Sequence, residues 1–86
     1  MNAQFEWDET KRRINLDQHQ LDFADVHGFG WDEARVEPSD RHEESRWVAY
    51  GNFDDQLHAV VFTMRGDVIR IISFRRARPR EVAKYG

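Results

Sequence analysis

The sequence contains no cysteine. Disulfide bonds, thiolate zinc sites and thiol nucleophiles are therefore excluded, and nothing suggests a secreted disulfide scaffold. No apolar run approaches the roughly 20 residues that a membrane-spanning helix needs. The first eight residues include Glu6 and Asp8 and lack the basic start and apolar middle of a signal peptide. These absences favour a soluble, unprocessed, cytoplasmic protein that does not bind membranes.

The length of 86 residues predicts a single domain over residues 1–86. A chain this short buries only about 60–65% of the surface that its unfolded form exposes, so its core is small. A partner that covered apolar surface would add noticeably to its stability.

The net charge of −3 hides an uneven distribution of charged residues. Residues 65–86 contain seven basic and two acidic residues, whereas residues 1–64 contain six basic and fourteen acidic ones. The basic excess is almost all arginine, whose guanidinium group binds phosphate with two parallel hydrogen bonds. This pattern favours a local anionic partner such as a phosphate backbone, the alternative being ordinary solvated strand and helix faces.

The N-terminal third predicts one strand and two helices. Residues 3–7 alternate between apolar and polar side chains, which favours a short strand. Asp8 is a suitable N-cap for a helix over 9–19, a segment without glycine or proline. Asp22 is a second N-cap, for a short helix that the two following glycines end.

The rest of the chain predicts a strand-rich half. Segment 31–45 is acidic and contains Pro38, so we expect a loop with little regular structure. Three strands joined by tight turns follow, over 46–52, 57–64 and 68–74. Proline is tolerated at the first position of a helix, which favours a last helix over 79–85. The order β-α-α-β-β-β-α predicts an α+β fold: an antiparallel sheet of about four strands with the helices on one face.

Arginines gather in and after the last predicted strand. Strict alternation places Val68, Arg70, Ile72 and Phe74 on one face and Ile69, Ile71, Ser73 and Arg75 on the other. Arg70 would then lie among apolar neighbours, where its charge requires an anion. That anion is either a carboxylate, such as Glu6 or Glu44, or a substrate phosphate. Four further arginines are placed to surround the same site: Arg65, Arg75, Arg76 and Arg78.

Three polar residues share one stripe of the first helix: Lys11, Asn15 and His19 follow each other at intervals of four. Such a stripe suits RNA cleavage, in which the ribose 2′-hydroxyl attacks the adjacent phosphate. That reaction needs a proton acceptor, positive charge on the phosphoryl oxygens and an acid for the leaving oxygen. Histidine is suited to acid–base work near neutral pH. The alternative is that His19 only complements the dipole at the helix C-terminus.

The last predicted helix carries Glu81 and Tyr85 four residues apart. Tyr85 could stack on an unpaired base or, alternatively, pack the helix onto the sheet. The remaining histidines, His27, His42 and His58, follow no metal-ligand spacing, so we expect no metal and no cofactor.

Two blocks of this sequence carry a family resemblance. The first is Phe5-Glu6-Trp7-Asp8-Glu9-Thr10-Lys11 with Asn15, His19 and Phe23-Ala24. The second is Thr63-Met64-Arg65-Gly66 and Arg70-Ile71-Ile72-Ser73-Phe74-Arg75-Arg76-Ala77, with Glu81 and Tyr85. Together they resemble the BrnT toxins. Two features depart from that pattern: Phe74 stands where alanine is common, and Gly28 and Gly30 break the second helix.

The resemblance implies a RelE-like fold and a type II toxin that cuts RNA and arrests growth. It also implies a BrnA-like ribbon-helix-helix antitoxin as partner, so that the toxin forms a hetero-oligomer and meets DNA only through the antitoxin. The polar signature residues that match are Lys11, Asn15, His19, Arg65, Arg70, Ser73, Arg75, Arg76, Glu81 and Tyr85.

We therefore expect an endoribonuclease that acts without a metal. The expected catalytic residues are Arg70, Arg75, His19, Lys11 and Glu81, with His19 or Glu81 as proton acceptor. The expected RNA-binding residues are Arg65, Arg76, Arg78, Asn15 and Tyr85. Two alternatives remain: a non-catalytic nucleic-acid-binding module, or an inactive toxin homologue that binds only its antitoxin.

Overall fold

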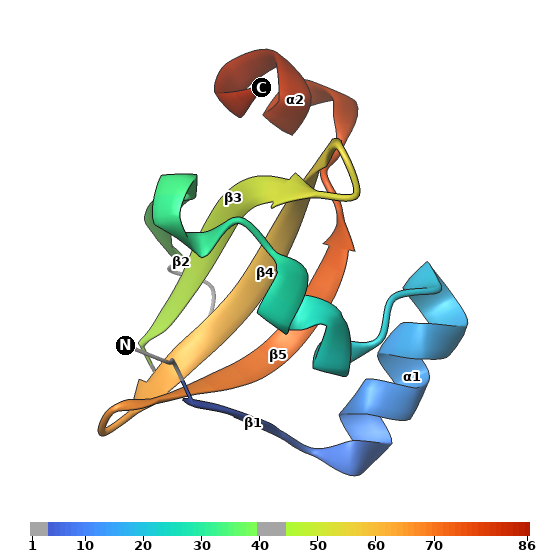
Figure 1. Ribbon diagram of the computed structural model, residues 1–86, viewed down its shortest axis with the longest axis vertical. Coiled ribbons are helices and arrows are strands. Elements are labelled where there is room, and N and C mark those ends of the chain that lie inside the picture. Colours follow the sequence, from blue (N-terminus) through green and yellow to red (C-terminus); the bar gives the residue numbers. More distant parts are fainter. Residues whose placement is uncertain (1–3, 40–44) are drawn as a thin grey trace.

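The computed structural model describes residues 4–39 and 45–86. Its elements in chain order are β1 (Gln4–Trp7), α1 (Glu9–His19), the 3₁₀ helices η1 (Phe23–Gly28) and η2 (Trp31–Glu33), β2 (Arg35–Ser39), β3 (Arg46–Phe53), β4 (Gln56–Arg65), β5 (Val68–Arg76) and α2 (Pro79–Tyr85). Within this part of the chain, five strands form one sheet in the order β1-β5-β4-β3-β2 (Figure 1). No helix in it is long and apolar enough to cross a bilayer.

The predicted helix starts are confirmed. The carboxylate of Asp8 accepts hydrogen bonds from the backbone N–H groups of Thr10 and Lys11, and α1 spans the predicted residues. Asp22 accepts in the same way from the N–H of Ala24. The short helix that follows it is a 3₁₀ helix rather than an α-helix, a form that proteins use in short segments and connectors.

The predicted sheet is wrong in two respects. β1 pairs with β5 in parallel, so the sheet is mixed and has five strands rather than about four antiparallel ones. Its order therefore differs from the β-α-α-β-β-β-α order expected of a RelE-like fold. The segment predicted as a loop contains η2 and β2, and β2 pairs antiparallel with β3. An outermost strand tolerates Pro38, because a missing N–H costs nothing on the unpaired side. The rest of that predicted loop, residues 40–44, lies outside the described residues.

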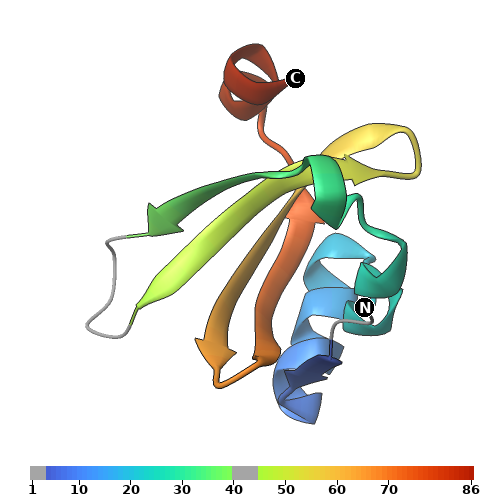
Figure 2. The same ribbon diagram turned by 60° about the vertical axis from the view of Figure 1, so that its left-hand side comes forward.

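The core lies on one face of the sheet, under α1, η1 and η2 (Figure 2). It is built from eight buried side chains: Phe23, Val26, Phe29, Ala49, Val60, Phe62, Ile71 and Phe74. The expectation that all helices pack on one face is wrong for α2. That helix stands at the end of the sheet, and its Tyr85 ring stacks on Tyr50 of the opposite face at 4.2 Å between centroids. The opposite face is therefore largely free of helices.

A β-bulge in β5 changes which side chains share a face. Val61 pairs with Ser73 but Phe62 pairs with Ile71, so Ile72 is an extra residue without an opposite partner. Ile71 and Phe74 consequently both enter the core, 1% and 0% exposed. The strict alternation predicted from sequence is wrong beyond this point. Arg70 and Arg75, predicted on opposite faces, lie on the same face, away from the core.

Asn15 of α1 closes the edge of β5 beyond its pairing with β1, which ends at Ile71. The Asn15 amide donates to the carbonyls of Leu21 and Phe74, at 2.9 and 2.8 Å, and its oxygen accepts from the Phe74 N–H at 3.1 Å. The side chain thus replaces a missing neighbouring strand and is only 5% exposed.

We expect Asn15→Ala to lower the free energy of unfolding by about 3 kcal/mol, because it leaves buried backbone groups of β5 without partners. Urea denaturation at neutral pH measures this loss. Gln18→Ala, at an exposed position of the same helix, is the matched control and should change stability by less than about 0.5 kcal/mol. Equal stability of the two variants would show that water replaces the amide without cost.

Candidate active site

The face opposite the core carries most of the candidate site, and we call it the open face. Strand register and side-chain alternation arrange its residues in three rows running from β2 to β5. The row next to α2 is Arg35, Tyr50, Ala59 and Arg75. The middle row is Glu37, Val48, Val61 and Ser73. The far row is Ser39, Arg46, Thr63 and Arg70.

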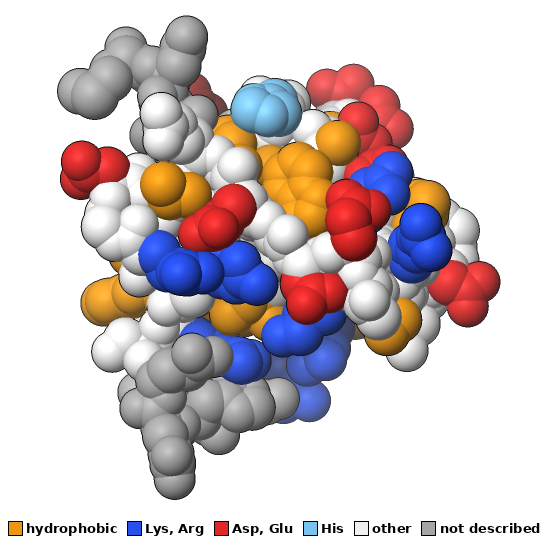
Figure 3. All heavy atoms as spheres, turned by 90° about the horizontal axis from the view of Figure 1, so that it is seen from below, with side chains coloured by type: hydrophobic (Ala, Val, Ile, Leu, Met, Phe, Trp, Pro, Cys, Tyr) orange, Lys and Arg blue, Asp and Glu red, His pale blue; other side chains and the backbone are white. Residues whose placement is uncertain are grey.

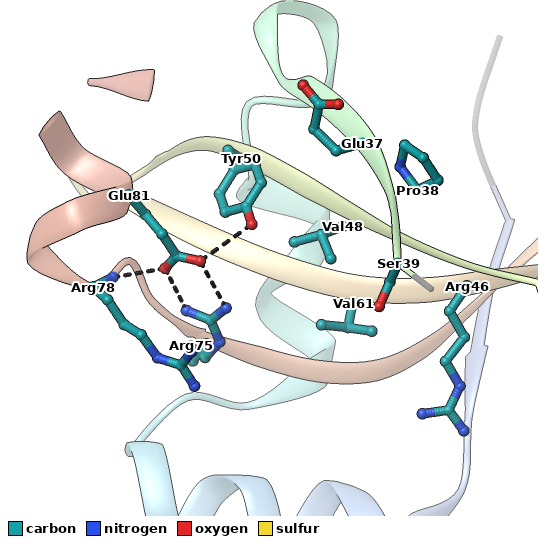
Figure 4. A pocket seen from close by; sticks show the side chains of 10 residues that line it. All are labelled: Glu37, Pro38, Ser39, Arg46, Val48, Tyr50, Val61, Arg75, Arg78 and Glu81. Atoms are coloured by element: carbon teal, nitrogen blue, oxygen red, sulfur yellow. Dashed lines mark hydrogen bonds and ion pairs between the residues drawn. The ribbon is translucent and has the colours of Figure 1, made fainter. Parts of the chain in front are cut away.

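A cavity of about 510 Å³ lies over the first two rows and extends to Ser39 and Arg46 of the far row; it is named here the open-face pocket (Figure 4). Its lining residues are Glu37, Pro38, Ser39, Arg46, Val48, Tyr50, Val61, Arg75, Arg78 and Glu81. They come from β2, β3, β4, β5 and the start of α2. A volume of this size is typical of small-molecule and cofactor sites.

An ion pair between β5 and α2 lines one side of the pocket. Nη1 of Arg75 donates to Oε1 of Glu81 at 2.7 Å, and Nη2 donates to Oε2 at 3.1 Å (Figure 4). The hydroxyl of Tyr50 donates to Oε2 at 3.1 Å, and the N–H of Arg78 donates to Oε1 at 2.8 Å. The side chains of Arg75 and Glu81 are only 15% and 12% exposed, so this geometry is held firmly.

These contacts determine the protonation of the group. The hydrogen bonds from Arg75, with help from the Arg78 N–H, lower the pKa of Glu81 to about 2 despite its burial. Burial and the nearby Glu81 charge raise the pKa of Tyr50, which keeps its proton on the hydroxyl. Four donors occupy the Glu81 carboxylate, which is all that its lone pairs accommodate. Glu81 therefore has no free site for a substrate proton.

The depressed pKa makes a prediction about acid stability. Because the folded-state pKa of Glu81 lies below its ordinary value of 4.5, its ionised form stabilises the protein at higher pH. That contribution is lost as the pH falls from about 4.5 towards 2. We expect wild type to lose about 2 kcal/mol more than Glu81→Gln between pH 5 and pH 2. Urea denaturation of both proteins across this range measures the difference, and parallel curves would contradict the assignment.

A second cavity, of about 500 Å³, adjoins the first and is called here the His19 depression. It lies between the end of α1 and the β3–β4 hairpin and is lined by Gln18, His19, Gln20, Leu21, Phe53, Asp54, Gln56, His58, Arg75, Arg76 and Arg78. Arg75 and Arg78 line both cavities. These arginines therefore form a wall shared by the two cavities, with an exposed imidazole on one side and the open face on the other.

Arg70 meets a carboxylate, which is the alternative that the sequence left open. Its Nη1 lies 3.3 Å from Oε2 of Glu6, its neighbour on β1, and Arg65 lies 3.7 Å from the other oxygen. Viewed from below the orientation of Figure 1, the surface of the protein carries acidic and basic side chains side by side (Figure 3). Arg70 and Arg75 are five residues apart on one strand, about 15 Å. In this structure they face different carboxylates, Glu6 of β1 and Glu81 of α2, and so do not converge on one phosphoryl group.

The stripe on α1 is only partly brought to the site. Lys11, Asn15 and His19 all line a small hollow of about 140 Å³ beside Ser73. Lys11 and His19 are eight residues apart, about 12 Å along the helix, so they serve different groups. The amide of Asn15 is used up by backbone partners, as described above. The structure gives it a structural place rather than contact with a ligand.

Two predicted RNA contacts have partners inside the protein. A terminal N–H of Arg76 donates to the side-chain oxygen of Gln56. The ring of Tyr85 stacks on Tyr50, and the cations of Arg35 and Lys84 lie 5.8 and 5.3 Å from its centre. Packing of α2, the alternative weighed for Tyr85, is therefore what the structure shows.

Sequence reasoning missed Tyr50 and Glu37. Alternation along β3 places Tyr50 on the face opposite the buried Ala49, but its partner Glu81 is 31 residues away and no spacing rule connects them. Glu37 was missed because it lies in the segment that the sequence predicted as a loop. Within residues 4–39 and 45–86, no three side chains of the ligand types gather closely enough to hold a metal ion.

Comparisons with known proteins agree on one family. A family model described as the ribonuclease toxin BrnT of type II toxin-antitoxin systems matches residues 7–81. The 1.1 Å crystal structure of the Brucella abortus ribonuclease toxin BrnT is similar to this chain at 33% identity and a TM-score of 0.74. The match covers 90% of this chain and 99% of the Brucella chain. No curated protein matches. The chain therefore belongs to the BrnT family of ribonuclease toxins from type II toxin-antitoxin systems.

Proposed function

We propose that this chain is a metal-independent endoribonuclease that cleaves RNA by attack of a 2′-hydroxyl on the adjacent phosphate. The observation that carries the proposal is the position of Arg75. Its guanidinium is oriented by Glu81 and lies where the open-face pocket meets the His19 depression. A single RNA strand that crosses β5 at this point would place one phosphate beside Arg75, with room for nucleotides on both sides.

Arg75 is assigned to the scissile phosphate. Glu81 occupies one N–H on each terminal nitrogen, which leaves Nε–H and one Nη2–H without a hydrogen-bond partner among the described residues. These two donors suit the non-bridging oxygens, whose charge grows in the transition state. Because the Arg75–Glu81 pair is nearly neutral, the attractive field depends on the neighbouring Arg76 and Arg78. Neither forms an ion pair with another described residue.

His19 is assigned to proton transfer. It is exposed at the end of α1 and lines the same depression as Arg75 and Arg78. Of the two proton acceptors considered, Glu81 is the poorer, because its pKa of about 2 makes it a weak base and four donors already occupy it. Glu81 is therefore a positioning residue for Arg75. Lys11, Arg65 and Arg70 are assigned to flanking phosphates, which their distance from Arg75 allows.

The proposed partner is a BrnA-like ribbon-helix-helix antitoxin in the cytoplasm, which neutralises the toxin in a hetero-oligomer and alone contacts DNA. A type II toxin requires a protein antitoxin, and this family is of that type. Co-expression with the candidate antitoxin should rescue growth and yield one co-purifying complex.

The proposal is tested by incubating the purified chain with total RNA, with and without EDTA. We expect chelator-resistant cleavage that leaves 2′,3′-cyclic phosphate ends. Affinity for an uncleavable RNA should fall steeply with salt, because arginine–phosphate contacts release bound counterions. Binding without cleavage would favour the non-catalytic nucleic-acid-binding module. If the chain neither binds nor cleaves RNA, the result would favour the inactive homologue.

A further inference from the structure

The middle row of the open face offers an apolar floor beside the phosphate-binding arginine. Val48 of β3 and Val61 of β4 are direct cross-strand partners, and both line the open-face pocket. Both are partly exposed although they lie in the centre of the sheet. Arg75 and Arg78 bound the pocket on the β5 side. An apolar surface next to guanidinium groups suits a nucleobase whose phosphate those groups hold.

A carboxylate stands on the far side of this floor. Glu37 of β2 is the register partner of Val48 and lines the same pocket (Figure 4). It is partly buried, yet it forms no ion pair or hydrogen bond with any other described residue. Two other partly buried acids of the described residues lie on or beside the open face, and each has a basic partner. Glu81 binds Arg75, and Glu6 of β1 binds Arg70. Glu37 is therefore available to a ligand.

We propose that the open-face pocket is a guanine subsite, in which Val48 and Val61 support the base and Glu37 reads its Watson–Crick edge. The inference rests on the proposed ribonuclease function and adds a base preference to it. β2 and β5 are three strand spacings apart, about 14 Å. A nucleotide bridges this span when Arg75 holds its phosphate and Glu37 extends towards the far edge of its base.

Guanine is selected by its hydrogen-bond donors. Its N1–H and exocyclic N2–H lie side by side, so they match the two oxygens of one carboxylate in a bidentate contact. Adenine and cytosine offer only an amino group at this edge, and uracil only one imino N–H. Each of these bases places an acceptor beside its donor, and that acceptor would face the second Glu37 oxygen. The pocket therefore discriminates by repulsion as well as by attraction.

The test uses four short oligoribonucleotides that differ only in the base at the cleavage position. The purified chain should cleave the guanine substrate at least tenfold faster than the other three, the discrimination typical of one bidentate base contact. Glu37→Gln keeps the size of the side chain but removes one acceptor and should reduce this preference to less than about threefold. Its rate on the adenine substrate should rise above that of wild type, because the amide N–H of glutamine faces the adenine acceptor that a Glu37 oxygen repels. The matched control, Glu33→Gln, alters an exposed acid of η2 outside the pocket and should keep the full preference.

Binding is measured in parallel with the same oligonucleotides carrying a 2′-deoxyribose at the cleavage position, which blocks the attack. A guanine preference in binding that Glu37→Gln abolishes would support the subsite even if the chain cleaved no RNA, in which case only the proposed function would fail. Cleavage with equal rates at all four bases would overturn the subsite and leave the function standing. A guanine preference that Glu37→Gln leaves intact would also overturn it.

Discussion

Arg75→Ala is expected to lower kcat/KM for RNA cleavage by about 10²–10³-fold, the usual effect of removing one donor to a developing oxyanion. Arg75 is the one described side chain that lines both cavities and is also held in a bidentate pair by a buried carboxylate. Hydrogen-bond donors that are already oriented stabilise the transition state strongly, because they do not have to move as negative charge develops on the phosphoryl oxygens. The loss should appear in kcat/KM measured with a defined oligoribonucleotide.

The variant also leaves Glu81 without its partner, so a structural effect has to be separated from a catalytic one. Removing one member of a buried pair destabilises by about 3–5 kcal/mol, whereas removing both is often tolerated. Arg75→Ala combined with Glu81→Ala should therefore recover much of the stability and none of the cleavage. Arg80→Ala, on the exposed surface of α2, is the control and should lose less than about threefold. Full activity of the double variant would refute the assignment.

Local signals in the sequence located the starts of α1 and η1 correctly, because capping depends on neighbouring residues. Asp8 and Asp22 cap helices through contacts two or three residues away, and both were visible in the sequence. Strand β2 was not visible, since three of its five residues are polar, a fourth is proline, and its stability derives from pairing with β3. Its composition resembles a loop because an edge strand is exposed on much of its surface.

The candidate site was predicted as a set of residues but not as a geometry. The bulge at Ile72 determines that Arg70 and Arg75 share a face, and a bulge leaves no mark in a periodicity of two. The partners of the arginines come from distant segments: Glu6 for Arg70 and Glu81 for Arg75. Sequence named Glu6 as one alternative partner, and it placed Arg75 and Glu81 in the site without pairing them. Only the tertiary structure shows that Glu81 binds Arg75, and this contact is why we propose that Glu81 positions Arg75 and is not the base.

The remaining large effect concerns His19. We expect His19→Ala to lower kcat by about 10²–10³-fold with little change in KM, because a proton-transfer group acts in the transition state and contributes little to ground-state binding. His19 is exposed, so truncation should leave stability nearly unchanged. His27→Ala is the matched control. It removes an exposed histidine of η1 that lines neither cavity and should retain activity within about threefold.

Two measurements distinguish proton transfer from a structural role. The His19 depression is open to solvent, so added imidazole should enter it and restore part of the activity of His19→Ala, but none of that of Arg75→Ala. A substrate with sulfur in place of the leaving 5′ oxygen needs no acid, because a thiolate leaves without a proton. Since we assign removal of the 2′ proton to His19, the variant should remain slow on this substrate. If His19→Ala cleaved the sulfur-containing substrate as fast as wild type does, His19 would be the acid instead. If imidazole restored the activity of His19→Ala on neither substrate, His19 would have no part in proton transfer.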